Sequence, residues 1–336
     1  MTTSPYETAP QAQVCTAGPP TPRVPVGTVA PVTLACLPTS VWVTAQKDAR
    51  NQRRDHYTPE SAAHPAKMLP AIAAHAIATY TTPGQLVLDP MCGIGTTLVE
   101  AVHLGRDAIG VELEGRWTAV AKANLNQART SGATGRATVH TGDARTAHTV
   151  IGEEHHGRAQ LLLTSPPYGA SVHGQVRATR ETGRRGIGKF DTTYGNNPAN
   201  LAHAPTDDLL EAFTTILTNC LPLLAPGGTV AVTARPWRHH GELVDLPAAV
   251  IAAGQAAGLV PVERCVALLA GLRDDRLVAR PSFFQLKNVR AARAAGVPMH
   301  LIVHEDVLVF TKPQTPQLPA QMTGLQGGPS SRAAAT

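Results

Sequence analysis

A short apolar run passes directly into a glycine turn and then into a helical pattern, and this order limits the folds open to the chain. The run occupies residues 86–89 (LVLD), the turn occupies 90–97 (PMCGIGTT), and apolar residues at helical spacing continue to Gly105. Glycines between a buried strand and a helix let the backbone approach a ligand closely, and they leave the amides of the helix N-terminus free to contact it. The stretch predicts a strand, a ligand-binding turn and a helix.

Similar apolar runs follow along the chain. Residues 108–112, 138–140 and 159–163 predict further strands, and the connections are long enough for right-handed crossovers. Later runs at 229–233, 260–269 and 301–311 predict three more, with helices near 207–224 and 247–257. The sequence therefore predicts an α/β fold, built on a doubly wound, mostly parallel sheet of seven strands.

Composition divides the chain into a core with loose ends. Residues 1–54 are expected to form a disordered, basic N-terminal arm, residues 55–312 the folded domain, and residues 313–336 a disordered tail. The arm contains a short strand pattern at 39–44 and a basic cluster at 47–54, for which a solvated surface and phosphate contact both stay open. Two interruptions without periodicity, at about 169–205 and 271–298, carry arginines and are expected to contact the target.

The overall charge and the cysteines narrow the function classes. A formal charge of +5 and a pI near 9.1 permit a polyanionic partner without requiring one. Five widely spaced cysteines without a Cys-x-x-Cys pair argue against a disulfide framework and a zinc site, and no paired histidines have metal-ligand spacing. No secretory leader or long apolar run is found, so we expect a cytoplasmic protein with no membrane partner and no metal.

The acid at the end of the first strand helps to select the ligand of the glycine turn. A nicotinamide dinucleotide motif needs a third glycine where this chain has Leu98, and a carboxylate at Asp89 would repel a pyrophosphate. The same carboxylate would attract a sulfonium and an ammonium group, which indicates S-adenosylmethionine as the cofactor. Glu112 ends the next strand about 20 residues after the turn, where such folds place a carboxylate on ribose hydroxyls.

A second stretch stops the predicted strand at 159–163. It consists of Thr164, Ser165, Pro166, Pro167 and Tyr168. Proline cannot donate to a strand ladder, so the chain must leave the sheet here. Ligands of open α/β sheets bind outside the carboxyl ends of the strands, so this tip is a candidate reaction site.

These two stretches resemble a known family. Residues 89–97 (DPMCGIGTT) look like the cofactor motif of S-adenosylmethionine-dependent methyltransferases, and residues 164–168 (TSPPY) resemble the catalytic motif of enzymes that methylate exocyclic amino groups of DNA bases. Residues 64–67 (HPAK) and 304–310 (HEDVLVF) are similar to that family's additional cofactor motif and closing strand. The resemblance covers about residues 55–312 and implies a class I, Rossmann-like methyltransferase domain.

The resemblance also implies a cofactor site. Asp89 would hold the ammonium group, Gly93 and Gly95 would pass the methionine part, Glu112 would take the ribose, and Asp143 would approach the adenine amino group. For Lys67 a solvated charge at the helix entry stays open, and Cys92 is expected mainly to pack. The predicted cofactor-binding residues are Lys67, Asp89, Pro90, Cys92, Gly93, Gly95, Thr96, Glu112, Asp143 and Thr164.

The predicted catalytic residues are Ser165, Pro166, Pro167 and Tyr168. An exocyclic amine is a poor nucleophile because its lone pair is delocalised into the ring, so the enzyme needs acceptors that draw the amino hydrogens out of plane. The Ser165 hydroxyl and the Pro166 carbonyl can do this, and the two proline rings fix the direction of the carbonyl. Tyr168 can stack on a base that has swung out of the duplex.

The sequence thus predicts a DNA methyltransferase, of the kind found in restriction-modification. Serine before the two prolines favours the cytosine amino group, and adenine stays open. One alternative is a tRNA guanine-N2 methyltransferase, although such enzymes usually carry a sizeable RNA-binding domain ahead of the core and about 55 residues are too few for one. The other alternative is a non-catalytic nucleic-acid-binding protein on the same scaffold.

Overall fold

The structure is a computed structural model, and it describes residues 37–167, 175–178, 187–190, 194–203, 205–239, 242–281 and 283–314. Most of the predicted N-terminal arm, the predicted C-terminal tail after 314 and the predicted catalytic Tyr168 lie outside these ranges. The main helices are α1 (Ala49–Arg53), α2 (Pro70–Tyr80), α3 (Thr96–His103), α4 (Gly115–Thr130), α5 (Ala147–Ile151), α6 (Thr206–Cys220), α7 (Leu246–Ala256) and α8 (Phe283–Ala294).

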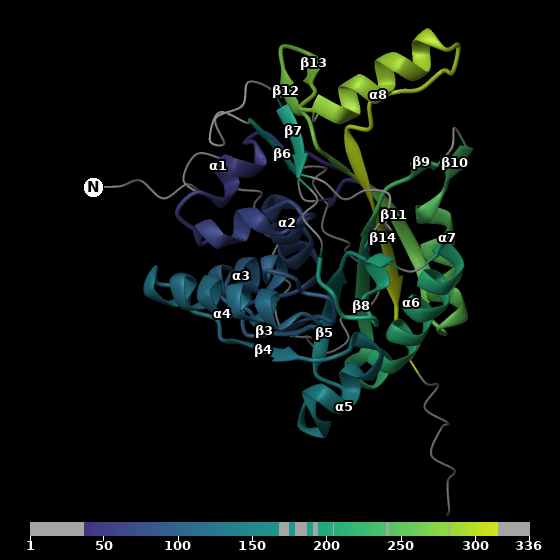
Figure 1. Cartoon of the computed structure of the whole chain (residues 1–336). Coiled ribbons are helices and arrows are strands. Elements are labelled where there is room, and N and C mark those ends of the chain that lie inside the picture. Colours follow the sequence, from purple (N-terminus) through teal and green to yellow (C-terminus); the bar gives the residue numbers. More distant parts are fainter. Residues whose placement is uncertain are drawn as a thin grey trace, which may run out of the picture.

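A single large sheet crosses the molecule, with strand order β1-β11-β14-β8-β5-β2-β3-β4 (Figure 1). Its strands are β1 (Val41–Trp42), β2 (Leu86–Asp89), β3 (Asp107–Glu112), β4 (Ala137–Thr141), β5 (Ala159–Thr164), β8 (Leu224–Ala234), β11 (Val260–Leu268) and β14 (His304–Thr311). Neighbouring strands are parallel except for β14, which is antiparallel to both β8 and β11. The predicted α/β, mostly parallel, doubly wound sheet is confirmed.

Helices cover both faces of this sheet, as Figure 1 shows. One apolar cluster joins β2, β5 and β8 to α6 and α7, and a second joins the opposite face of the sheet to α2 and α3. Leu161 and Leu163 belong to the second cluster, whereas Leu162 belongs to the first. A strand that is buried on both faces needs a continuous apolar run, and this explains the LLL sequence at 161–163.

The sheet has eight strands instead of the predicted seven, because β1 adds an edge strand. Val41 pairs with Val266 of β11, and Trp42 is buried with only 2% of its surface exposed. The Trp42 ring packs against His75 of α2, with ring centroids 4.4 Å apart. The ordered fold therefore begins before Asp55, since burial of one large aromatic side chain fixes a segment that composition alone assigns to the arm.

The carboxyl ends of β2, β3, β4, β5 and β8 meet at one edge of the sheet. The antiparallel direction of β14 brings its first residues to that same edge. Smaller elements extend from it: β6 (Gln175–Ala178) with β7 (Ile187–Phe190), β9 (Trp237–His239) with β10 (Glu242–Val244), β12 (Gly271–Arg273) with β13 (Arg276–Val278), and α8. Figure 1 shows them gathered at the upper end of the molecule.

The helices of the described residues were compared with the length and apolar character of a membrane-spanning helix. Within those ranges, no helix combines the length and the apolar character needed to cross a bilayer.

Candidate active site

A cavity of about 580 Å³ opens at the carboxyl edge of the sheet. Most residues predicted from the sequence line it: Lys67, Asp89, Pro90, Cys92, Gly93, Thr96, Glu112, Asp143, Ser165, Pro166 and Pro167. Gly95 and Thr164 are not among its lining residues. The strand ends divide the cavity into a β2–β4 half, formed by the ends of β2, β3 and β4, and a β5–β8 half, formed by the ends of β5, β8 and β11 and the start of β14.

Asp89 ends β2 with its carboxylate buried, at 3% exposure. Three donors hold it: Thr97 Oγ1 at 2.7 Å, Thr164 Oγ1 at 2.9 Å and the backbone N–H of Met91 at 3.1 Å. Burial raises the pKa of Asp89 to about 6, and these hydrogen bonds oppose the rise. A carboxylate offers about four lone-pair sites, so Asp89 ties β5 to the glycine turn and retains acceptor capacity for a cation.

The two glycines of the turn adopt backbone conformations that other residues rarely take. Gly93 has a φ of 54° and Gly95 a φ of 81°. A Cβ on Gly93 would lie 3.1 Å from His64 Nε2, and one on Gly95 would lie 3.2 Å from Ala121 Cβ. Both positions thus favour glycine by conformation and by space. Gly95 acts behind the wall of the cavity, where it lets α3 approach α4.

Cys92 has a packing role as well as a place on the wall. Its side chain is buried, and a Cβ on Gly110 of β3 would lie 2.8 Å from Cys92 Sγ. Burial raises the pKa of the Cys92 thiol well above its ordinary value, so the reactive thiolate is disfavoured. The Cys92 side chain therefore occupies the space next to Gly110, where a larger residue would not fit.

Glu112 ends β3 and reaches back to the glycine turn. Its Oε2 accepts the N–H of Gly93 at 2.8 Å, and its Oε1 accepts the N–H of Glu114 at 2.9 Å. The residue is 9% exposed, and burial raises the pKa of its carboxyl to about 7. The carboxylate thus lies on the cavity wall with its orientation fixed by two backbone amides.

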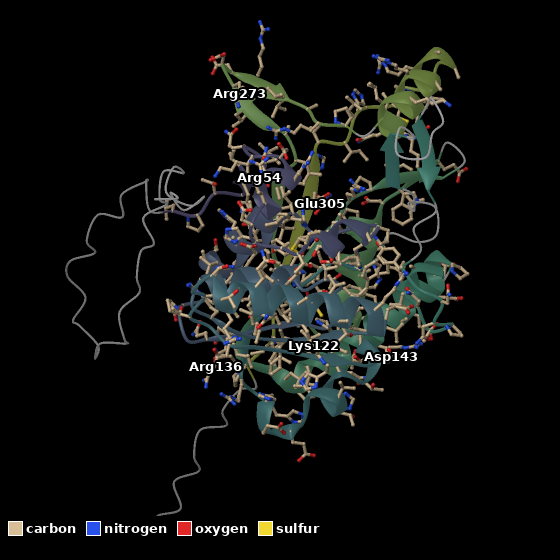
Figure 2. All side chains as sticks on the ribbon, turned by 60° about the vertical axis from the view of Figure 1, so that its left-hand side comes forward. Arg54, Lys122, Arg136, Asp143, Arg273 and Glu305 are labelled. Carbon is tan, nitrogen blue, oxygen red and sulfur yellow. The ribbon has the colours of Figure 1, made fainter. Side chains whose placement is uncertain are left out.

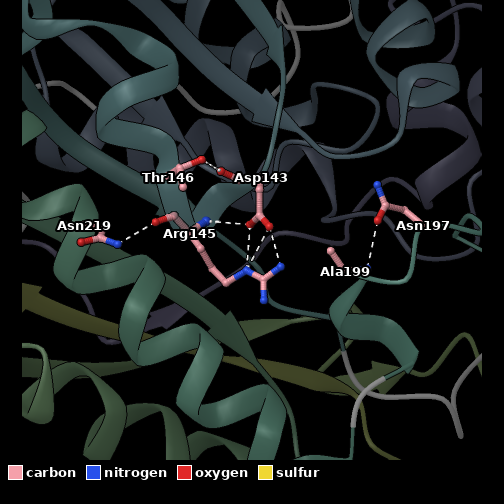
Figure 3. A network of polar contacts seen from close by, with 6 residues as sticks. All are labelled: Asp143, Arg145, Thr146, Asn197, Ala199 and Asn219. Atoms are coloured by element: carbon pink, nitrogen blue, oxygen red, sulfur yellow. Dashed lines mark hydrogen bonds and ion pairs between the residues drawn. The ribbon is translucent and has the colours of Figure 1, made fainter.

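Asp143 lies at the end of β4 and is held by Arg145. The Arg145 guanidinium donates to the Asp143 carboxylate through Nε at 3.0 Å and through Nη2 at 2.5 Å (Figure 3). Burial raises the pKa of Asp143, but hydrogen bonds from Arg145 outweigh it and leave the pKa lowered. Asn219 of α6 donates to the Arg145 carbonyl at 2.6 Å. The predicted contact of Asp143 with an adenine amino group would share these oxygens with Arg145, and it stays a prediction.

The segment before α2 forms the outer side of the β2–β4 half. Lys67 Nζ donates to the carbonyl of His64 at 2.5 Å, and burial lowers the pKa of Lys67 to about 8. Burial also lowers the pKa of His64 to about 3. At neutral pH the wall therefore presents the Lys67 cation beside an uncharged imidazole, and the Arg53 guanidinium, which donates to the Met68 carbonyl, lines the cavity next to them.

The β5–β8 half begins where β5 leaves the ladder. Thr164 is fully buried and pairs with Val232 of β8, and the next three residues, 165–167, line the cavity. The sequence prediction that the two prolines end this strand at the site is confirmed. The Ser165 side chain and the Pro166 carbonyl thus lie at the carboxyl edge, next to the glycine turn through the Thr164 and Asp89 hydrogen bond.

Two charged residues continue the β5–β8 half. Ala234 of β8 pairs with Asp306 of β14, so Arg235 and Glu305 occupy the next positions on these adjacent strands. Both line the cavity, together with Leu269 after β11. Along the edge, the order is therefore the proline tip, Arg235 and Glu305.

Sequence reasoning missed several lining residues, namely Trp117, Tyr194, Asn200, Arg235 and Glu305. Arg235 directly follows a predicted strand, and that position was its usable signal. Tyr194 and Asn200 lie within a stretch without periodicity, and nothing in their local sequence marks them.

The β2–β4 half fits S-adenosylmethionine by its donor set. Buried acids at Asp89 and Glu112 suit cationic and hydroxyl groups, and the Gly93 turn lets a ligand approach the backbone. Within the described ranges, no three His, Cys, Asp or Glu side chains are grouped as metal ligands would be.

Comparisons with known proteins give matches over parts of the chain. Residues 35–123 match a family model described as DNA methylase. A tRNA (guanine(10)-N2)-dimethyltransferase from Methanocaldococcus jannaschii is 30% identical over 122 residues, which cover 35% of this chain and 34% of that protein. The Type II methyltransferase M2.LlaDCHI of Lactococcus lactis subsp. cremoris is 38% identical over 69 residues, 20% of this chain and 26% of that protein. The chain thus matches about a third or less of the length of these relatives.

Among solved structures, TrmN from Thermus thermophilus aligns with a TM-score of 0.44 and 17% identity, over 78% of this chain and 53% of that one. The family-model match contains the glycine turn and the ends of β2 and β3. With the Type II relative, it shows that this part of the chain is similar to DNA methylases.

Proposed function

We propose that the chain transfers a methyl group from S-adenosylmethionine to the exocyclic amino group of cytosine, with adenine as the second candidate base, in DNA. The observation that carries this proposal is that Ser165, Pro166 and Pro167 line the same cavity as Asp89 and Glu112. A donor in the β2–β4 half and a base in the β5–β8 half would meet where Ser165 adjoins the Asp89 turn, which the Thr164 hydrogen bond holds to β5. Such a reaction would take place with the DNA in the cytoplasm.

The chain's residues supply positioning and electrostatics. The bound cofactor supplies an electrophilic methyl group on a sulfonium. The Ser165 hydroxyl and the Pro166 carbonyl accept the two amino hydrogens, which turns the nitrogen lone pair out of the ring plane and toward the donor. With the cofactor bound, the nitrogen would take its methyl group, the carbon–sulfur bond would break to leave the neutral thioether, and the methylated amine would release one proton to solvent water. Tyr168, which lies outside the described residues, remains the proposed stacking residue for the flipped base.

Arg235 favours a base with an acceptor beside its amino group. Along the edge it lies next to the proline tip, so an amine at Ser165 places the adjoining ring position toward Arg235. Cytosine N3 and adenine N1 are acceptors there, and arginine is always a donor. Guanine differs on its pairing edge, where the neighbour of its amino group is the donor N1–H, although its other neighbour, N3, is an acceptor. Arg235 thus suits the pairing edge of cytosine or adenine, and it suits guanine only through N3.

A basic segment near the cavity fits the phosphates of DNA. Residues 271–298 contain six basic and two acidic residues, which is +4 of the chain's formal charge of +5. Arg280 donates to the carbonyls of Ala45 and Gln46, so the β12–β13 hairpin is joined to the chain just before the basic helix α1. Figure 2 shows Arg273 projecting from this hairpin above Glu305. We propose that this surface binds the DNA backbone.

One specific observation favours the RNA alternative. The archaeal relative that is 30% identical over 122 residues is a tRNA guanine-N2 methyltransferase. Its match covers about a third of each chain, so it bears on the cofactor turn more than on the base. A non-catalytic role on the same scaffold is disfavoured by the intact Asp89 turn and by Ser165 on the cavity wall.

The proposed function is tested by the nucleosides of host DNA. DNA from cells with and without the gene is digested and examined for N4-methylcytosine and N6-methyladenine. We expect one of these nucleosides to be present in DNA from cells with the gene and to be absent from DNA of cells without it. Unchanged DNA together with a lost N2-methylguanosine in tRNA would overturn the proposal.

A further inference from the structure

Residues 194–201 lie against the β2–β4 half of the cavity. The sequence places this segment in the interruption at 169–205, which is expected to contact the target. In the structure, the carbonyl of Tyr194 accepts the indole N–H of Trp117 in α4 at 2.5 Å. Tyr194, Asn200 and Leu201 all line the cavity. The segment is therefore attached to the helix that follows β3, on the side of the predicted cofactor site.

Glu114 holds the other end of this segment. Its Oε1 accepts the Asn200 side-chain amide at 3.0 Å and the backbone N–H of Asn197 at 3.3 Å. A Cβ on Gly195 would collide with the Glu114 carboxylate, so glycine lets the chain pass close to it. Glu114 lies two residues after Glu112, and the attachment is therefore built directly onto the predicted ribose site.

The ring of Tyr194 continues the wall toward the glycine turn. It packs edge-on against His64, with centroids 5.3 Å apart, and His64 packs against Trp117 at 4.7 Å. His64 in turn leaves little room for a side chain on Gly93, where a Cβ would lie 3.1 Å from its Nε2. Tyr194, His64 and Gly93 thus form one continuous layer beside the cavity.

Tyr194 lines the same cavity as residues of both halves, Glu112 and Arg235. Burial raises the pKa of Tyr194, so its ring carries a neutral hydroxyl. Arg235 belongs to the β5–β8 half and Glu112 to the β2–β4 half. An aromatic ring on this cavity wall suits a sulfonium group, because aromatic rings attract cations.

We propose that residues 194–201 form the outer wall of the cofactor site, and that Glu114 and Trp117 are the positioning residues that hold this wall in place. The inference rests on S-adenosylmethionine as the cofactor and does not depend on which nucleic acid is methylated. It reassigns the end of the 169–205 interruption from target recognition to cofactor retention.

The role of the Glu114 side chain can be separated from that of its backbone. Its N–H donates to Glu112 Oε1 at 2.9 Å, and truncation of the side chain leaves that bond in place. Glu114→Ala therefore removes the acceptor for Asn197 and Asn200 while the orientation of Glu112 is kept. Glu114→Gln keeps one acceptor oxygen, and Lys122→Ala on the exposed side of α4 is a matched control.

The test measures binding of S-adenosylmethionine to the full chain without nucleic acid, by calorimetry, with dissociation rates from stopped-flow displacement. We expect Glu114→Ala to raise Kd about tenfold, mainly through faster dissociation, since the two hydrogen bonds that hold the wall are lost. Trp117→Phe should raise Kd a few-fold, and Glu114→Gln and Lys122→Ala should bind within about twofold of wild type. Unchanged binding by a folded Glu114→Ala would overturn the proposal.

Gly195→Ala disturbs the same contact from the side of the 194–201 segment. It tests the proposal independently if Glu114→Ala does not fold. The new methyl group must displace the Glu114 carboxylate, so we expect a similar loss of affinity. The double variant should lose no more than either single one, because both break one contact. Wild-type affinity for S-adenosylmethionine in Gly195→Ala would contradict the proposal that residues 194–201 retain the cofactor. Failure of the wild type itself to bind the cofactor would instead contradict the methyltransferase assignment.

Discussion

The two halves of the cavity are built in different ways. The β2–β4 half is made of strand ends and one glycine turn that are close in sequence, and its carboxylates are fixed by backbone amides and threonine hydroxyls. The β5–β8 half combines the proline tip with Arg235 and Glu305, which come from strands far apart in the chain. Under the proposed function, the first half would be a prearranged binding site for a constant ligand, and the second would carry the residues that choose a target.

If the halves have these separate roles, substitutions in one should leave the function of the other intact. The largest effect is expected at Ser165. Ser165→Ala removes an acceptor for the amino group and should lower turnover by about 10²- to 10³-fold, comparable to the loss of one preorganised polar group in other active sites. Single-turnover methyl transfer measures this loss, and calorimetry should show cofactor affinity within about twofold of wild type. Full activity in this variant would remove the proposed role.

Glu112→Gln tests the opposite half. Loss of one buried, charge-assisted contact to the cofactor should raise its Kd about 10- to 100-fold. Turnover at saturating cofactor should change by less than about threefold, because the amino acceptors at Ser165 and Pro166 are untouched. Titration of methyl transfer against cofactor concentration separates the two parameters. A large loss of turnover at saturation would show that the halves are not independent.

A smaller effect is expected at Arg235. Arg235→Met should lower kcat/KM for the target DNA about tenfold, because one hydrogen bond to the base is lost. The second partner of this hydrogen bond is the ring nitrogen beside the amino group. On DNA whose target base has carbon at that position, kcat/KM of the wild type should fall by a similar factor, and kcat/KM of the variant should fall no further. Arg238→Met is the control, since Arg238 does not line the cavity. Independent, additive losses would place Arg235 away from the base.

The smallest expected effect is on stability. Folding raises the pKa of Glu112 from 4.5 to about 7. The folded protein therefore binds this proton more tightly than the unfolded chain does at pH values between 4.5 and 7. The free energy of unfolding of the wild type relative to Glu112→Gln should therefore fall as pH rises from about 5 to 7, with a slope of at most about 1.4 kcal/mol per pH unit. Urea unfolding at several pH values measures it. If this difference in unfolding free energy does not change with pH, the pKa of Glu112 is not raised by folding, and the prediction is wrong.

The contrast between the halves also decides what the sequence can predict. The turn at Asp89 and the acid at Glu112 follow from local strand, turn and helix patterns, and the structure places both on the cavity wall. For Arg235 the sequence gives only a position after a strand, and its place beside the proline tip depends on the strand order, whereas no local pattern marks Tyr194. The strand pattern at 39–44 was visible, but its place in the main sheet was not, because burial of Trp42 depends on contacts with β11 and α2.

The central claim is that a methyl group passes from the β2–β4 half to a base amino group held in the β5–β8 half. The most direct test incubates the purified chain with deuterium-labelled S-adenosylmethionine and a mixture of DNA and tRNA from cells that lack the gene. The two nucleic acids are then separated and digested for mass spectrometry, with Ser165→Ala in parallel. We predict labelled N4-methylcytosine or N6-methyladenine in the DNA and almost none with the variant. Label in tRNA guanosine, or equal labelling by Ser165→Ala, would contradict the account.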